Sequence, residues 1–218
     1  MHSFTEENYL KTLHHLTKHK NQVSVKELSE VLDIKMPTVT SMMKKLAEKG
    51  LVKYESYKPL KLTTEGKKAG ALIIRKHRLT EMFLVEKMGF GWEEVHEIAE
   101  QIEHVKSPAF FAKIDELLGH PKVDPHGSPI PDKEGNMKWI EYSKLGSCKV
   151  GDQFTVKAVM NSSEDFLAFL NSRELLLGTR VKIDKVEEFD GSMLVSYGKR
   201  TNESLSGKVA EMLLGEKE

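Results

Sequence analysis

The 218-residue sequence contains a single cysteine, Cys148, and no long hydrophobic run. One cysteine excludes an intramolecular disulfide and a cysteine-rich zinc or iron–sulfur cluster, so a bound metal would have nitrogen and oxygen ligands. No apolar stretch approaches the ~20 residues that span a bilayer, and the N-terminus lacks a basic start followed by an apolar segment. We therefore expect a cytoplasmic protein with no membrane partner.

Aromatic residues are also scarce, at 7%, whereas hydrophobic residues make up 39% and charged residues 30%. This balance is typical of an ordinary soluble globular protein and excludes a disordered one. Prolines are few, and four of the seven lie between Gly119 and Gly135, which indicates an ordered loop or linker. We predict three domains, over residues 1–64, 65–137 and 138–218.

The formal net charge of zero is an average over unlike parts. Residues 1–80 carry 16 Lys/Arg and 8 Asp/Glu, whereas residues 81–118 carry 3 Lys/Arg and 9 Asp/Glu. A basic segment attracts the phosphate backbone of a nucleic acid and an acidic one attracts cations, so the asymmetry indicates two kinds of partner. The alternative is two solvated faces that happen to differ in charge.

The first domain shows the pattern of a winged helix-turn-helix. Apolar residues recur at helical spacing from Tyr9 to Leu16, after a cap at Ser3 or Thr5. Ser24 and Glu27 have the spacing of a capping box that opens a second helix, through Leu32. Pro37 suits the first turn of a third helix, which stops at Gly50. Residues 51–55 and 60–62 then alternate as the two strands of a hairpin, separated by a turn. Two short helices joined by a tight turn and followed by a hairpin are typical of this DNA-binding motif.

The rest of the chain is predicted to be helical first and β-rich later. A long helix runs from Thr63 or Thr64 to Gly89, and two more cover about 92–106 and 108–118. These helices form either a dimer surface or an intrachain core. Beyond Trp139, short β-like runs at 153–156, 180–183 and 193–195 flank a helix at 164–170, which suggests a small SH3-like barrel. The expected fold class is mainly α with a small β domain.

Four potential metal ligands follow one another at helical spacing: His96, Glu100, Glu103 and His104. On a helix that turns ~100° per residue they share one face. Carboxylates and imidazoles so close together are unfavourable unless a cation lies among them, which suits a divalent first-row metal. His77 and Glu81, four residues apart, could add ligands, although such a pair alone is more often a solvated helix face.

Three segments resemble, in order and spacing, the signature segments of the diphtheria-toxin-repressor and manganese-repressor family: Arg-Lys-His-Arg-Leu at 75–79, Glu-His-Val at 103–105 and Pro-His-Gly-Ser-Pro-Ile-Pro at 125–131. The resemblance extends from about Glu6 to Val209. It implies a winged helix-turn-helix domain, a helical metal-binding and dimerisation domain, and a C-terminal SH3-like (FeoA-like) domain. It also implies a repressor of manganese or iron homeostasis that binds double-stranded operator DNA as a homodimer, with no small organic substrate.

The resemblance further implies two Mn²⁺ (or Fe²⁺) ions per subunit and their ligands. Positions that match the primary regulatory site of the family are Asn8, Glu100, Glu103 and His104, with His77 adjacent. Positions that match the second site of the manganese-sensing members are Glu81, Asp124, His126 and Asp165. His96 matches a ligand of the ancillary site in the iron-sensing branch.

Two positions depart from the family pattern. Asn8 stands where the family usually has Asp or Met, and a neutral amide oxygen is a weaker ligand than a carboxylate, so Glu7 or water could substitute. Glu100 stands where the iron-sensing branch has a sulfur ligand. A set of only nitrogen and oxygen ligands favours Mn(II), with Fe(II) second.

The third helix is the expected DNA-recognition element. Residues at or near its N-terminal end that can reach base edges or the backbone are Lys35, Pro37, Thr38, Thr40 and Ser41. By resemblance, Pro37 and Ser41 match positions near bases, and the other three match positions near the backbone. Four lysines are better placed to contact phosphates: Lys44, Lys45, Lys53 and Lys58. Each of them, taken singly, could instead be an ordinary surface charge.

The sequence allows two alternatives to the metal-dependent repressor. A dinuclear metal hydrolase could use Glu97 or Glu103 as a base, but the sequence has no His-Glu-x-x-His helix and no glycine-rich phosphate loop, so we predict that the protein is not an enzyme. The other is a winged-helix regulator whose metal site is structural or degenerate. The weak ligand Asn8 is compatible with this hypothesis.

Overall fold

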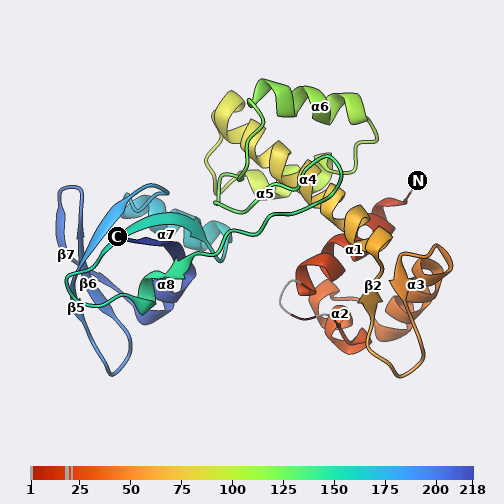
Figure 1. Ribbon diagram of the computed structural model, residues 1–218, viewed down its shortest axis with the longest axis horizontal. Helices are drawn as coiled ribbons and strands as arrows, with labels where there is room; N and C mark the ends of the chain where they lie inside the picture. The colour runs from red at the N-terminus through yellow and green to blue at the C-terminus, as the bar shows by residue number, and fades with distance from the viewer. Residues whose placement is uncertain (1, 18–19, 21) are drawn as a thin grey trace. The chain divides into compact units, whose positions relative to one another are not determined.

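The computed structural model of the chain describes residues 2–17, 20 and 22–218 (Figure 1). Four residues of the first predicted domain lie outside them: Met1, Lys18, His19 and Asn21. Contacts divide the chain into two compact units. The first comprises Met1–Thr80, Ile98–Lys122 and Ile130–Lys138, and the second comprises Glu81–Glu97, Val123–Pro129 and Trp139–Glu218.

The first unit begins with three helices: α1 (Phe4–Leu16), α2 (Val25–Leu32) and α3 (Met36–Glu48). Ser3 and Glu6 form a reciprocal capping box at the start of α1, and the Ser24 hydroxyl accepts the Glu27 N–H at the start of α2. Pro37 lies in the first turn of α3, and Gly50, with φ of 72°, follows its end. These predicted boundaries are confirmed.

A short hairpin completes the winged helix-turn-helix. Strands β1 (Val52–Lys53) and β2 (Lys61–Leu62) pair antiparallel, and Val23 forms an additional bridge with Leu60. Burying the apolar sides of the three helices and the hairpin against one another is the main favourable term for this part of the fold. Its fully buried side chains include Leu10, Leu13, Leu28, Val39, Met43, Leu46 and Leu60.

The long helix α4 (Thr64–Met88) is confirmed, and its N-terminal part packs closely on the DNA-binding part. A Cβ at Gly66 would lie 2.0 Å from the Leu51 carbonyl oxygen, and one at Gly70 would lie 2.9 Å from the Leu10 carbonyl oxygen. Two glycines one turn apart therefore allow α4 to approach α1 and the wing. Further along α4, Arg75 pairs with Asp115 of α6 (Pro108–Leu117) at 2.7 Å.

The predicted helix over 92–106 is shorter than expected, because α5 covers only Val95–Ile102. At its C-terminal end the Val105 N–H bonds to the Ile102 carbonyl, which tightens the chain into a turn over Glu103 and His104. The Glu103 carbonyl accepts a hydrogen bond from Lys76 Nζ at 2.6 Å, as basic side chains commonly provide at helix ends. Glu103 and His104 therefore lie just beyond the end of α5 rather than within the longer helix that was predicted.

The sheet of the second unit is formed by six strands: β3 (Ser143–Lys144), β4 (Gln153–Val159), β5 (Arg180–Val186), β6 (Met193–Tyr197), β7 (Arg200–Leu205) and β8 (Leu213–Lys217). They pair antiparallel in the order β3-β8-β4-β5-β6-β7, and β5, β6 and β7 lie side by side in Figure 1. Besides the 3₁₀ turn Leu145–Ser147, this unit contains α7 (Glu164–Ser172), which was predicted, and α8 (Gly207–Met212), which was not.

The predicted barrel is not closed. Among the described residues, β3 pairs only with β8 and β7 pairs only with β6, so the sheet has two open edges. The edge strand β3 is only two residues long, too short to complete a closed hydrogen-bond ladder. With this sheet the chain is a mixed α/β protein rather than a mainly α one.

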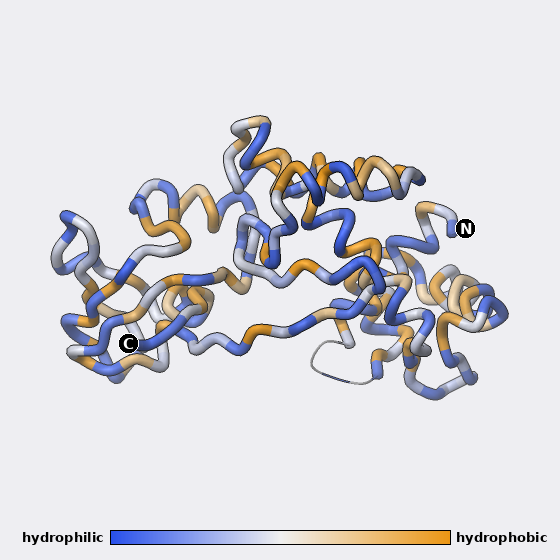
Figure 2. The backbone as a smooth tube through the Cα atoms, turned by 45° about the horizontal axis from the view of Figure 1, so that its top comes forward, coloured by the Kyte–Doolittle hydropathy of each residue, from blue (hydrophilic) through white to orange (hydrophobic). Residues whose placement is uncertain are grey.

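No helix in the described part of the chain has both the length and the apolar character needed to cross a membrane. Figure 2 shows hydrophilic residues interspersed with hydrophobic ones along the helices.

Candidate metal centres

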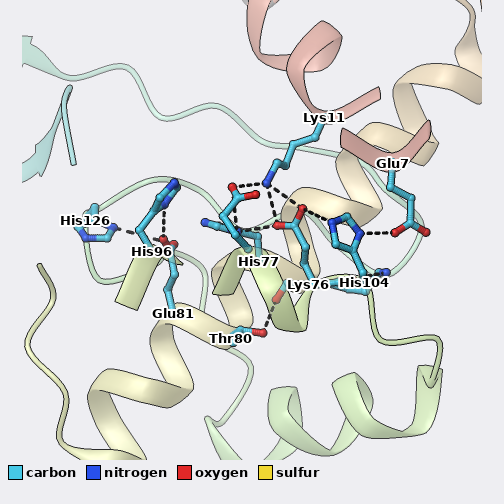
Figure 3. A network of polar contacts seen from close by, with 11 residues as sticks. Glu7, Lys11, Lys76, His77, Thr80, Glu81, His96, His104 and His126 are labelled. Atoms are coloured by element: carbon cyan, nitrogen blue, oxygen red, sulfur yellow. Dashed lines mark hydrogen bonds and ion pairs between the residues drawn. The ribbon is translucent and has the colours of Figure 1, made fainter. Parts of the chain in front are cut away.

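The first candidate centre lies in the first unit, beside α1. Glu7, Asn8 and Lys11 follow one another at spacings of one and three residues on α1, and therefore lie on the same side of the helix. Glu7 Oε2 accepts a hydrogen bond from His104 Nδ1 at 2.7 Å (Figure 3). Asn8 Oδ1 is buried and has no hydrogen-bond partner among the described residues. A buried polar atom without a partner is rare and costly, so the Asn8 amide oxygen is suited to coordinate a cation.

Glu103 is the centre of this first cluster. Its side chain is fully buried, and Oε2 lies 2.6 Å from His77 Nδ1 and 2.9 Å from Lys11 Nζ. Its Oε1 lies 2.8 Å from Lys11 Nζ and 3.8 Å from His104 Nε2, but accepts no well-formed hydrogen bond from the described part of the chain. Glu100 Oε1 lies 2.5 Å from the same ammonium group. Lys11 thus contacts both carboxylates, and the sequence analysis did not identify it.

An open pocket adjoins the cluster and is lined by Phe4, Asn8, Glu100, Gln101 and His104. Phe4 stacks on the His104 ring, with centroids 4.8 Å apart. Three residues predicted for the primary site, Asn8, Glu100 and His104, therefore face a common space that adjoins buried Glu103. Oxygen and nitrogen donors of this kind fit a divalent first-row ion.

The second candidate centre lies in the second unit. Each of Glu81, Asp124 and His126 offers a ligand atom, and these atoms all lie within 4.8 Å of one another. All three residues are buried. Two buried carboxylates beside an imidazole again form a nitrogen and oxygen donor set that a divalent cation would neutralise.

The loop that carries Asp124 and His126 has a defined shape. Asp124 Oδ1 accepts the backbone N–H groups of His126 and Ser128, both at 2.9 Å. Gly127 adopts φ of 83°, and a Cβ there would lie 2.2 Å from the Lys157 carbonyl oxygen of β4. The Val159 N–H of β4 donates to the His126 carbonyl at 3.0 Å. The loop is therefore attached directly to the sheet.

The orientation of His126 follows from its contact with Trp92. His126 Nε2 lies 2.8 Å from the Trp92 carbonyl oxygen, which can only accept, so Nε2 is the protonated nitrogen. In the neutral imidazole Nδ1 then carries the lone pair, and this atom lies 3.9 Å from Glu81 Oε2. A histidine whose other nitrogen donates to a carbonyl is the common arrangement of a metal ligand.

Two further predicted ligands are less enclosed. His96 is half exposed, and its Nδ1 lies 3.3 Å from Glu81 Oε1. Asp165 lies on the exposed side of α7 and is not part of the three-residue group formed in the described part of the chain. The role of both residues stays a prediction.

The predicted DNA-binding residues lie on and around α3. Of these nine residues only Thr40 is partly buried, and the others are exposed. Lys45 and Lys49 also contact the buried Glu6 of α1, at 3.0 and 2.7 Å. Burial favours the neutral form of Glu6, but hydrogen bonds from Lys49, the Ser3 N–H and Lys45 outweigh it and lower the pKa of Glu6 to about 2. The sequence analysis missed this link between α1 and α3.

Three sequence families match successive parts of the chain. Residues 1–60 match the iron dependent repressor N-terminal DNA binding domain, residues 63–132 match the iron dependent repressor metal binding and dimerisation domain, and residues 144–217 match the FeoA domain. The iron-dependent repressor IdeR of Mycobacterium leprae is 35% identical over 127 residues, which are 58% of this chain and 55% of that protein. The chain thus spans about half the length of this relative.

Longer matches cover most of the chain. The diphtheria toxin repressor of Corynebacterium efficiens is 32% identical over 190 residues, or 82% of each protein. A solved manganese-dependent transcriptional repressor in complex with manganese is 32% identical, with a TM-score of 0.84 over 96% of this chain and 98% of that one. The chain therefore belongs to the family of iron-dependent, diphtheria-toxin-repressor-type transcriptional repressors, which are controlled by a bound metal.

Proposed function

We propose that this chain represses transcription by binding operator DNA as a homodimer when it is loaded with Mn²⁺ or Fe²⁺. One observation carries the proposal: α1 contributes residues both to the first metal cluster and to the contact with the recognition helix. Glu7 contacts His104, and Glu6 contacts Lys45 of α3 and Lys49 at the end of that helix. Restraining α1 at the cluster therefore restrains α3, which is what coupling between a metal site and a DNA site requires.

The proposed ligands fall into two sets, one for each of two ions per subunit. Asn8, Glu100, Glu103 and His104 would hold the first ion, with His77 hydrogen-bonded to Glu103 behind them. Glu81, Asp124 and His126 would hold the second, with His96 and Asp165 as additional ligands. The bound ion would supply positive charge that neutralises the buried carboxylates.

Mn(II) is the first choice of metal because all proposed ligand atoms are oxygen or nitrogen. Iron in the name of the mycobacterial relative and manganese in the solved neighbour support both candidates. The relative amounts available to the protein then decide which ion it senses, since a shared site binds Fe(II) more tightly than Mn(II).

Operator recognition is proposed for the N-terminal end of α3. Pro37 and Ser41 would face bases, and Lys35, Thr38 and Thr40 would lie near the backbone. Phosphates would be neutralised by four lysines: Lys44, Lys45, Lys53 and Lys58. Lys45 also forms an ion pair with Glu6. In the dimer, two copies of α3 would enter successive major grooves about 34 Å apart.

A homodimer is supported by the match to a metal binding and dimerisation domain over residues 63–132. The exposed large apolar side chains of the first unit include four within this matched region: Leu72, Val105, Phe110 and Leu117. Apolar side chains on neighbouring helices suit an interface between two copies. The division into domains at residues 64 and 137, and a location in the cytoplasm, are part of the same proposal.

The experiment is a DNA-binding titration. A duplex selected from a random-sequence library in MnCl₂ would be titrated at constant ionic strength with Mn(II), with anaerobic Fe(II), with Zn(II), and with EDTA. We expect Mn(II) to tighten binding by about 5- to 150-fold, the usual range of allosteric coupling. Equal affinity in Mn(II) and EDTA would contradict the proposal.

The second candidate function is a winged-helix regulator whose metal site is structural or degenerate. The neutral Asn8 and the ammonium of Lys11 within the first cluster favour it. This candidate predicts that Mn(II) raises the melting temperature while the affinity for DNA stays constant.

A further inference from the structure

The ammonium group of Lys11 lies between the carboxylates of Glu100 and Glu103. It donates hydrogen bonds to Glu100 Oε1 at 2.5 Å and to Glu103 Oε2 at 2.9 Å, and it lies 2.8 Å from Glu103 Oε1. The side chain is only 11% exposed. Figure 3 shows it extending from α1 toward these contacts. Charge-assisted contacts this short are among the stronger ones in proteins.

The charges around this group explain why it is held there. Glu7, Glu100 and Glu103 are three carboxylates, and Lys11 is the ammonium that contacts two of them. With neutral imidazoles, the cluster has a formal charge of −2. Glu103 is fully buried, so leaving its carboxylate without a counter-charge would be costly. Without a metal, Lys11 supplies that counter-charge.

We propose that Lys11 is a tethered competitor of the metal ion, whose ammonium occupies the carboxylates of the first cluster until a divalent ion displaces it. The proposal rests on the proposed metal-dependent function and adds how its threshold is set. A divalent ion bound by Glu100 and Glu103 would lie within a few ångströms of the ammonium, and the two positive charges would repel each other.

Displacement of Lys11 is sterically feasible. Lysine carries its charge at the end of a flexible four-carbon chain, and the group lies beside the open pocket lined by Asn8, Glu100 and His104. Asn8 lies three residues before Lys11 on α1, so the same turn of helix presents the unpartnered amide oxygen and the competing cation. The metal concentration needed to fill the cluster is therefore higher than the ligand set alone would require.

The test compares charge removal at Lys11 with the same change elsewhere. Lys11→Met keeps a similar chain length without the charge, and Lys11→Arg keeps the charge. Lys113→Met is the matched control because it removes an exposed lysine that pairs with Glu116 at 3.0 Å. All variants would carry His126→Ala, so that calorimetric titration with MnCl₂ reports the first cluster.

Two readouts are expected to move in opposite directions. In EDTA, Lys11→Met should melt at a lower temperature than the parent, because buried Glu103 loses its counter-charge. In MnCl₂ titrations, the same variant should bind Mn(II) more tightly, on the order of tenfold. Lys11→Arg should bind no more tightly than the parent, and Lys113→Met should change neither readout.

The outcomes separate this proposal from the one on which it rests. Mn(II) affinity that is unchanged or weaker in Lys11→Met, with binding intact in the parent, would overturn the competitor role alone. If Lys11→Met does not fold in EDTA, a Lys11→Arg protein that binds Mn(II) more tightly than the parent would overturn it instead. Absence of Mn(II) from the first cluster in the parent and every variant would overturn the metal-dependent function, and the competitor role with it.

Discussion

The Trp92 indole N–H donates a hydrogen bond to Asn171 Oδ1 at 2.7 Å, which joins the segment before α5 to helix α7. The carbonyl oxygen of Trp92 lies 2.8 Å from His126 Nε2. The Trp92 ring also stacks on the His126 imidazole, with centroids 5.8 Å apart. The matched FeoA domain, which includes α7, therefore supports His126, a proposed ligand of the second candidate centre, through one tryptophan. Residues that orient a metal ligand in this way usually change metal affinity when they are altered.

Removing the hydrogen bond between Trp92 and Asn171 should weaken binding of the second metal ion. Asn171→Leu deletes the acceptor of the indole N–H, so Trp92 and His126 lose part of their support. We expect about tenfold weaker Mn(II) binding at the second cluster, in line with other supporting residues. Since Trp92 and Trp139 are the only tryptophans, a Trp139→Phe background makes the fluorescence of Trp92 a direct readout. Asn171→Asp keeps an acceptor oxygen and should restore most of the affinity; unchanged binding in Asn171→Leu would exclude the supporting role.

Asp124 and Asp165 should differ in their effects. Asp124→Ala removes a buried proposed ligand, so it should lower the bound Mn(II) by one ion per subunit. It also removes the acceptor of two backbone N–H groups, which should lower the free energy of unfolding by about 1–3 kcal/mol. Asp165→Ala alters an exposed side chain, so stability should change by less than about 0.5 kcal/mol while the response to metal weakens. Metal analysis and thermal melting measure both. An unaltered metal response in Asp165→Ala removes this residue from the site.

Acid should weaken the contact between α1 and α3 through Glu6. Its pKa falls from 4.5 to about 2 on folding, so the ionised form stabilises the native state above pH 4.5. That stability is lost as pH falls from about 4.5 to about 2, and after screening of the exposed lysines we expect about 1–2 kcal/mol. Urea unfolding in EDTA across this range should therefore show a flatter pH dependence for Glu6→Gln. Glu48→Gln, which changes an exposed carboxylate on α3, serves as the control and should retain the parent's slope.

Two residues of α3 should affect DNA binding differently. Lys44→Ala should weaken binding to all duplexes and reduce the slope of log affinity against log salt by about one, because one phosphate contact is lost. Ser41→Ala should instead lower the discrimination between the selected duplex and single-base variants, by about 1–3 kcal/mol at one position. Salt titrations and competition assays separate the two effects. A sequence-selective loss in Lys44→Ala would contradict the assignment of this lysine to the backbone.

The local signals of the N-terminal part predicted its elements closely. Caps at Ser3 and Ser24, Pro37 in the first turn of α3 and Gly50 after its end act within a few residues of the chain, so they can be read without knowledge of the fold. The end of α5 could not be read in this way. It depends on Lys76, which is 27 residues away in sequence and bonds to the Glu103 carbonyl.

The sequence predicted which residue types could bind a metal, and its signature segments predicted the family. It did not predict which other residues contact the candidate ligands. Lys11 was invisible as part of the first cluster because its contacts with Glu100 and Glu103 span 89 and 92 residues. Trp92 and Asn171 are likewise joined across 79 residues. The sheet was recognised from β4, β5 and β6, but β7, β8 and its open edges follow from strand pairing.

The amino-acid sequence by itself determined helices α1 to α4, the basic character of α3, and a donor set of nitrogen and oxygen, because periodicity, capping and residue chemistry are local properties. Only the tertiary structure decided that α1 brings Glu6 to Lys45 of α3 and Lys11 to Glu103. Contacts between distant residues depend on how helices pack, and packing is settled by burial over the whole unit rather than by any one segment.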